Sequence, residues 1–203
     1  MFSHPPVLRI QLLGAFRVTL DGDPITNFDA DTARALLAYL ALHAHSAHRR
    51  AALADLLWCD QPPENSLHNL RSALNRLRKA LNDHDQAAQP LILAERQSIQ
   101  WNPHCAIWVD KLEFEQLLGE VKQHVHRELT KCPWCMKRLT QLAELYQGEF
   151  LADIQVDSLA FEEWQQDPVP TQCVLQPARP VRSNEKQRPP RGKILACVFG
   201  FSR

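Results

Sequence analysis

Residues 65–82, NSLHNLRSALNRLRKALN, carry bases and amides but no Asp or Glu. Arginine and lysine suit phosphates and guanine edges, and asparagine suits adenine edges, so this composition is typical of a surface that meets DNA. A solvated helix with a basic face would show the same composition, and the neighbouring elements must decide between the two. The candidate DNA-binding side chains of this segment are Asn65, His68, Asn69, Arg71, Ser72, Asn75, Arg76, Arg78 and Lys79.

A second set of residues has the chemistry of a metal site. Cys132 and Cys135 have a spacing that zinc ligands often have, and His124 and His126 lie just upstream. If Pro133 starts a helix, both thiols lie on its first turn. Buried or idle thiols are the more common interpretation of one CxxC motif, so we expect no cofactor, with a structural zinc as the alternative. Redox chemistry is disfavoured because no βαβ pattern surrounds the motif.

The leucines of the basic segment predict the helix that positions its polar side chains. Leu67, Leu70, Leu74, Leu77 and Leu81 recur at steps of three and four, which is the period of one apolar helix face. No Gly or Pro interrupts the segment. A rotation of about 100° per residue then places the amides and most of the bases opposite the leucines, with two arginines at the edge.

The flanking segments predict a winged helix. Residues 7–28 alternate between apolar and polar around an Asp-Gly turn, which predicts a small antiparallel sheet. Two helices are predicted next, one over DTARALLAYLALHA, capped by Asp29 or Asp31, and one over RRAALADLLW. After the basic helix, LILAE and SIQW predict a hairpin joined by Arg96 and Gln97.

This order of elements favours DNA binding over a merely solvated helix. In a winged helix the third helix enters the major groove and the hairpin reaches the neighbouring backbone. The basic helix is the third predicted helix, so Arg96 and Gln97 join the candidate DNA-binding residues. We expect an α+β fold: a winged helix-turn-helix with an N-terminal antiparallel sheet, followed by a short all-α region and a disordered tail.

Five motifs follow one another along the chain: LRIQLLGAFRVTLDG, ARALLAYLALH, RRAALADLLW, NLRSALNRLRKAL and LYQGEFLADIQVDSLAFEEW. In these motifs, over about residues 7–165, the chain resembles the Streptomyces antibiotic regulatory protein family. That family pairs an OmpR-type winged helix with a helical bacterial transcriptional activator domain. The resemblance implies an activator-type, sequence-specific regulator that binds double-stranded promoter DNA as a homodimer and contacts RNA polymerase. It also implies a recognition helix at Asn65–Asn82 and a wing at Leu91–Trp101.

The sequence divides into three predicted parts. Residues 1–108 are the winged-helix domain, 109–165 a partial helical bacterial transcriptional activator domain, and 166–203 a disordered, basic, Pro-rich tail. We expect Phe161 and Trp164 in the core, with a surface for a partner helix as the alternative. The family continues with further helices here, so the resemblance implies a truncated form. The alternative function is therefore a protein-interaction module or a truncated, non-activating fragment.

Composition and absent motifs narrow the class of function. The chain has 23 bases and 23 acids, so DNA binding must come from a local patch. It has no apolar run of the roughly 20 residues that a membrane span needs, and no signal peptide pattern at its start. We therefore expect a cytoplasmic protein with reduced thiols and no membrane contact. Without a glycine-rich phosphate loop, GxSxG or HExxH motif, we expect no enzymatic activity.

Overall fold

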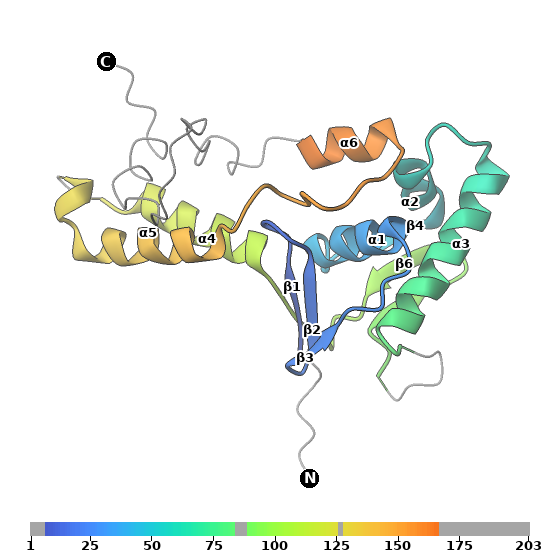
Figure 1. The fold of residues 1–203 in the computed structure, drawn as a ribbon, viewed down its shortest axis with the longest axis horizontal. Helices are drawn as coiled ribbons and strands as arrows, with labels where there is room; N and C mark the ends of the chain where they lie inside the picture. Colours follow the sequence, from blue (N-terminus) through green and yellow to red (C-terminus); the bar gives the residue numbers. More distant parts are fainter. Residues whose placement is uncertain (1–6, 84–88, 126–127, 167–203) are drawn as a thin grey trace, which may run out of the picture.

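The computed structural model describes residues 7–83, 89–125 and 128–166 (Figure 1). Residues 167–203, which hold nearly all of the predicted tail, lie outside the described residues, as does His126. The structure confirms the α+β prediction, with an N-terminal sheet, a winged helix and further helices. None of the described helices combines the length and the apolar character that crossing a bilayer requires.

The N-terminal segment forms a sheet because its side chains alternate between core and solvent. Leu8 and Ile10 are fully buried, whereas Arg9 between them is exposed. The strands, in the order β3-β2-β1-β7, are β1 (Val7–Gln11), β2 (Arg17–Leu20), β3 (Asp23–Ile25) and β7 (Ala106–Val109). Strand β1 pairs antiparallel with β2 as predicted, and it also pairs parallel with β7, which was not predicted.

Three helices and a second small sheet make up the winged helix. Their bounds are α1 (Asp31–Leu42), β4 (His48–Arg49), α2 (Arg50–Leu57), α3 (Pro63–Ala80), β5 (Ile92–Ala94) and β6 (Ser98–Trp101). Strands β5 and β6 form the predicted hairpin, and β4 adds an unpredicted third strand beside β6. The hairpin follows the third helix, which confirms the predicted order of elements.

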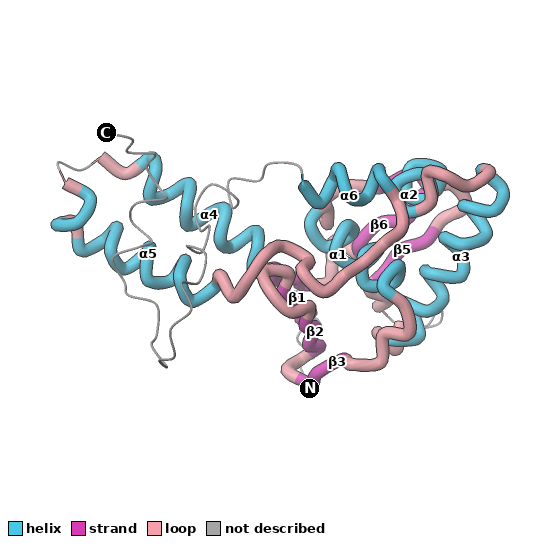
Figure 2. The backbone as a smooth tube through the Cα atoms, turned by 45° about the horizontal axis from the view of Figure 1, so that its top comes forward, coloured by secondary structure: helices cyan, strands magenta, loops and turns pink. Residues whose placement is uncertain are grey.

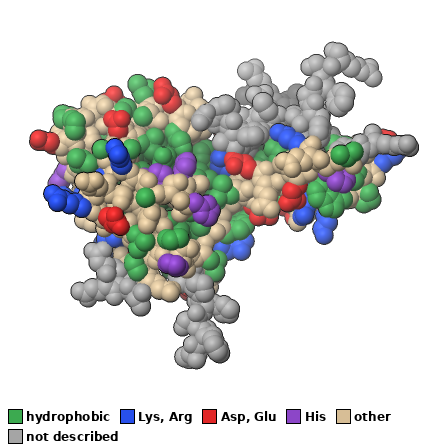
Figure 3. All heavy atoms as spheres, turned by 180° about the vertical axis from the view of Figure 1, so that it is seen from behind, with side chains coloured by type: hydrophobic (Ala, Val, Ile, Leu, Met, Phe, Trp, Pro, Cys, Tyr) green, Lys and Arg blue, Asp and Glu red, His purple; other side chains and the backbone are tan. Residues whose placement is uncertain are grey.

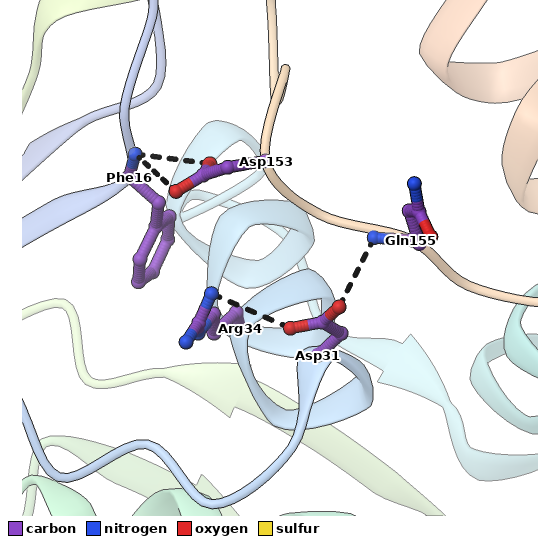
Figure 4. A network of polar contacts seen from close by, with 5 residues as sticks. All are labelled: Phe16, Asp31, Arg34, Asp153 and Gln155. Carbon is purple, nitrogen blue, oxygen red and sulfur yellow. Dashed lines mark hydrogen bonds and ion pairs between the residues drawn. The ribbon is translucent and has the colours of Figure 1, made fainter.

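The start of α1 differs from the prediction. Its N-cap is Ala30, which makes no side-chain cap hydrogen bond. Asp31 is instead the first helical residue, and its carboxylate accepts the backbone N–H of Gln155 at 3.3 Å (Figure 4). Close by, the carboxylate of Asp153 accepts the N–H of Phe16 at 3.0 Å (Figure 4). Asp31 therefore does not cap α1, because its carboxylate is turned towards a segment more than a hundred residues later in the sequence.

Helix α3 buries its leucines against α1 and α2. Leu70, Leu74 and Leu77 are at most 3% exposed and belong to the main apolar cluster. Leu81, which directly follows the helix, is also buried. Leu67 is the exception to the predicted apolar face, because it is 41% exposed and lines a surface groove instead of the core.

Beyond β7 the chain leaves the winged helix as a pair of helices. The elements are α4 (Asp110–Gln123), a 3-10 turn (Leu129–Lys131) and α5 (Pro133–Leu145). Phe114, Val121, Leu139 and Leu142 form a second apolar cluster between α4 and α5. Figure 2 shows this pair extending as an arm away from the winged helix.

The last described segment returns from the arm and completes the core of the winged helix. Leu151, Ile154, Val156 and Phe161 belong to the same apolar cluster as the buried faces of α1, α2 and α3. Helix α6 (Leu159–Gln166) packs on α2 at the top of the view in Figure 1. The buried position of Phe161 confirms the expectation that it lies in the core.

Two glycines let the returning segment pass close to the first sheet. The N–H of Gly14 donates to the carbonyl oxygen of Glu149 at 2.9 Å. Gly14 has a φ of +109°, and a Cβ there would lie 3.1 Å from the backbone of Gln147. A Cβ on Gly148 would lie 3.0 Å from the Cα of Gly14. The approach of the two backbones therefore requires glycine on both sides.

Gly14→Ala should lower the free energy of unfolding by about 1–3 kcal/mol, because alanine is strained at this φ and its methyl group meets the backbone. Gly119→Ala is the matched control in α4, where a Cβ would meet no atom within 4 Å. This control should stabilise by up to about 1 kcal/mol, since alanine favours a helix. Urea unfolding measures both, and equal stability of Gly14→Ala and the parent would contradict the proposed crossing.

Leu74→Ala and Leu77→Ala should each destabilise by about 2–5 kcal/mol, because each leaves a cavity in the core. Leu67→Ala, on the same helix but exposed, should cost about 1 kcal/mol or less. Thermal melts of the three variants test this. A similar loss in all three would show that the exposed and buried sides of α3 are assigned wrongly.

Candidate nucleic-acid interface

Helix α3 lies along one edge of the molecule (Figure 1). Its leucines and alanines are mostly buried, whereas most of its polar residues are exposed. It begins at Pro63, and proline suits the first turn because its fixed φ is already helical. Its 18 residues span about 27 Å, enough to lie along a major groove. The exposed members of the predicted set are Asn65, His68, Arg71, Asn75, Arg76 and Lys79.

The other predicted residues of α3 are partly buried and bind within the protein. Asn69 donates from Nδ2 to the side-chain oxygen of Gln61 at 2.7 Å. Ser72 donates to the carbonyl oxygen of His68 one turn earlier. Arg78 donates from Nη2 to the carbonyl oxygen of Ile92 at 3.2 Å and so joins α3 to the hairpin. These contacts help to position the exposed face of α3. The periodicity of the sequence could not distinguish these three residues from the exposed ones, because all of them lie outside the buried leucine side.

A groove of about 500 Å³ runs between α3, the start of α2 and the hairpin turn. Its basic side chains are Arg49, Arg50, Arg71 and Arg96. Arg49 and Arg50 were not among the predicted residues, because a pair of arginines at the start of a helix gives no sign of what faces it. The pairing of β4 with β6 brings them to the groove.

The pKa of Arg50 is lowered by its surroundings in this groove. Burial lowers the pKa of its guanidinium, and the positive charges of Arg71 and Arg78 lower that pKa further. Its Nε donates to the carbonyl oxygen of Glu95 at 2.8 Å, which fixes the side chain against the hairpin. Like charges held this close repel one another, and a polyanion would convert that repulsion into attraction.

The turn between β5 and β6 carries the two remaining candidates. Arg96 and Gln97 are exposed at the turn, which a hydrogen bond from the N–H of Glu95 to the carbonyl oxygen of Ser98 closes at 2.9 Å. The carboxylate of Glu95 accepts a hydrogen bond from the Ser98 hydroxyl. The turn therefore presents one arginine and one amide to the groove side of α3.

On the face that Figure 3 shows, the basic and acidic side chains of the described residues are interspersed. The balanced composition of the chain thus coexists with a local cluster of arginines beside α3.

Three of the four predicted metal ligands come together elsewhere, at the junction of α4 and α5. These are His124, Cys132 and Cys135, and the fourth, His126, is outside the described residues. Hydrogen bonding by the backbone N–H of Cys135 lowers the pKa of the Cys132 thiol, whereas burial raises the pKa of the Cys135 thiol.

Residues 30–98 match the family model described as "Transcriptional regulatory protein, C terminal". This stretch contains the three helices of the winged helix and reaches the first residue of β6. The match supports a DNA-binding regulator of transcription, in agreement with the face that α3 exposes. No curated protein matches the sequence significantly.

The fold of the winged helix and its arm is similar to a solved structure, Mycobacterium tuberculosis EmbR in complex with low affinity phosphopeptide. The TM-score is 0.61 at 21% sequence identity, and the similarity covers 80% of this chain. It covers 41% of the EmbR chain, so this chain spans about two fifths of that length. At this identity the likeness concerns the fold alone.

Arg71→Gln should leave the protein as stable as the parent or raise its stability by a few tenths of a kcal/mol, because it relieves repulsion on Arg50. Thermal melts at low ionic strength should show the gain, and added salt should remove it by screening the charges. Arg17→Gln, at an exposed position of β2, is the control, and its stability should show no such salt dependence. Destabilisation by Arg71→Gln at every salt concentration would refute the repulsion.

Proposed function

We propose that this protein is a sequence-specific, DNA-binding regulator of transcription in which α3 enters the major groove. The observation that carries the proposal is the exposed face of α3, where bases and amides continue into the arginine groove beside the hairpin turn. The family match over residues 30–98 supports the same function. A basic helix face that merely meets solvent would not explain why arginines from the start of α2, from α3 and from the hairpin turn gather around one groove.

The exposed side chains differ in the part of DNA that each is suited to bind, a base edge or a phosphate. Asn75 and Arg76 lie in the exposed stretch of α3 and have the side-chain geometry that binds adenine and guanine edges. Lys79, one turn further, is suited to a phosphate. Arg96 and Gln97, at the hairpin turn, are suited to the neighbouring backbone. Arg49 and Arg50 add positive charge where a phosphate strand would cross between the turn and α3.

We further propose an activator-type regulator that binds promoter DNA as a homodimer and contacts RNA polymerase. The support is the resemblance to the Streptomyces antibiotic regulatory protein family and its helical activator domain. A promoter–reporter assay with the full chain tests activation, and sedimentation of the protein bound to one and to two half-sites tests the dimer.

Selection of duplexes from a random pool, followed by titration at several salt concentrations, tests DNA binding itself. The parent should bind the selected site at least about a thousandfold more tightly than random DNA, with an affinity that falls steeply as salt rises. A protein-interaction module would select no sequence and show no such salt dependence, and that outcome would overturn the proposal.

Asn75→Ala and Arg76→Ala should each weaken binding to the selected site by about 1–3 kcal/mol and relax sequence preference at one position. Lys79→Ala should instead weaken binding to all sequences alike and reduce the slope of log affinity against log salt by about one. Lys122→Ala, which is exposed on α4, is the control and should bind like the parent. Parent-like binding by all three α3 variants would move the interface away from α3.

A further inference from the structure

Three sulfur and nitrogen donors converge where α4 ends and α5 begins. His124 is the C-cap of α4, Cys132 is the N-cap of α5, and Cys135 lies in the first turn of α5. The Nδ1 of His124 is 3.2 Å from the Sγ of Cys135 and 3.8 Å from the Sγ of Cys132. The three ligand atoms all lie within 4.8 Å of one another.

The backbone on both sides fixes this arrangement. Pro133 occupies the first position of α5, and the carbonyl oxygen of Cys132 accepts the N–H of Met136 at 3.0 Å. The N–H of His124 donates to the carbonyl oxygen of Glu120, which ends α4 at that residue. The two thiols therefore lie one helical turn apart, facing a histidine that a separate helix holds in place.

The distances suit tetrahedral zinc. Zinc lies about 2.3 Å from thiolate sulfur and about 2.0–2.1 Å from imidazole nitrogen, which places neighbouring ligand atoms roughly 3.5–3.8 Å apart. For a nitrogen–sulfur pair the tetrahedral value is about 3.6 Å, and the two nitrogen–sulfur distances in the protein, 3.2 and 3.8 Å, lie on either side of that value. Two soft thiolates and an imidazole favour zinc over calcium or magnesium, which prefer oxygen ligands.

We propose that His124, Cys132 and Cys135 bind one zinc ion that joins α4 to α5. The ion occupies a site with three protein ligands among the described residues, and a further ligand completes the tetrahedron. The site is independent of the DNA-binding proposal. Figure 1 shows the junction at the far end of the arm from α3, so zinc acts on the arm and not on the recognition face.

The surroundings hold the imidazole in the orientation that the site needs. The ring of Trp134 packs on that of His124, with centroids 4.6 Å apart and planes inclined by 30°. The guanidinium of Arg138 lies over the ring of Trp134, with its carbon 5.2 Å from the ring centroid. Its Nε lies 3.0 Å from the carboxylate of Glu120, so an ion pair links the same two helices beside the site. Cys135 is fully buried in the apolar cluster of α4 and α5.

Metal analysis and cobalt spectroscopy of the full chain test the site without any substitution. Protein purified under reducing conditions, with no chelator, should hold about one zinc per chain. After the zinc is removed, added Co²⁺ should give the strong ligand-field bands of a tetrahedral ion together with thiolate-to-cobalt charge transfer. A zinc content near zero that added Zn²⁺ does not raise would overturn the proposal, as would cobalt absorption without thiolate bands. A reduced protein that binds no zinc and re-forms a Cys132–Cys135 disulfide in air would overturn it equally.

Substitutions then test the ligand assignment. Cys132→Ser and His124→Asn should each weaken zinc affinity at least roughly tenfold in competition with a chromophoric chelator. Cys135→Ser should do the same, and circular dichroism shows whether this buried position still folds. Cys59→Ser removes a thiol outside the site and should bind zinc like the parent. Parent-like zinc affinity in folded Cys132→Ser and His124→Asn would refute the assignment.

Discussion

The buried carboxylate of Asp110 joins parts of the molecule that are far apart in the sequence. It accepts the backbone N–H groups of Leu12 and Leu13, at 2.8 and 3.0 Å, just beyond the end of β1. It also accepts the N–H of Lys111 at the start of α4. Burial raises the pKa of Asp110, and these N–H donors oppose that rise. Since a buried N–H without an acceptor costs about 1–3 kcal/mol, the direction in which α4 leaves the sheet depends on this side chain.

That junction also explains how one chain builds two apolar clusters. Leu12 belongs to the cluster of the winged helix, whereas the next residue, Leu13, belongs to the cluster of α4 and α5. The returning segment then passes Gly14 and places Leu151 and Phe161 in the first cluster. The start of α4 and the segment after α5 thus both attach the arm to the winged helix, and neither the helical pair nor the first core is independent of the other.

The same packing determines what the candidate interface presents. Burial of Leu70, Leu74 and Leu77 leaves α3 only one orientation, and most of its bases and amides then face outward, Asn69 and Arg78 excepted. Pairing of β4 and β6 adds Arg49 and Arg50 to that side, at the cost of repulsion among arginines. The positive charges of these arginines repel one another, and a bound polyanion would replace that repulsion with attraction, in agreement with the proposed DNA-binding surface.

The sequence by itself determined the elements whose signal is local. The leucine period predicted α3, and the alternation around short turns predicted β1, β2 and the hairpin. Local pattern could not predict β7 or β4, the exposure of Leu67, or the engagement of Asp31 by Gln155, because each depends on a partner distant in the sequence. Likewise, the sequence named Cys132, Cys135, His124 and His126 as candidate zinc ligands, but only the packing of α4 on α5 showed that His124 lies beside the two thiols. Periodicity reports which side of an element is apolar, whereas contacts between distant elements are decided when their apolar faces are buried together.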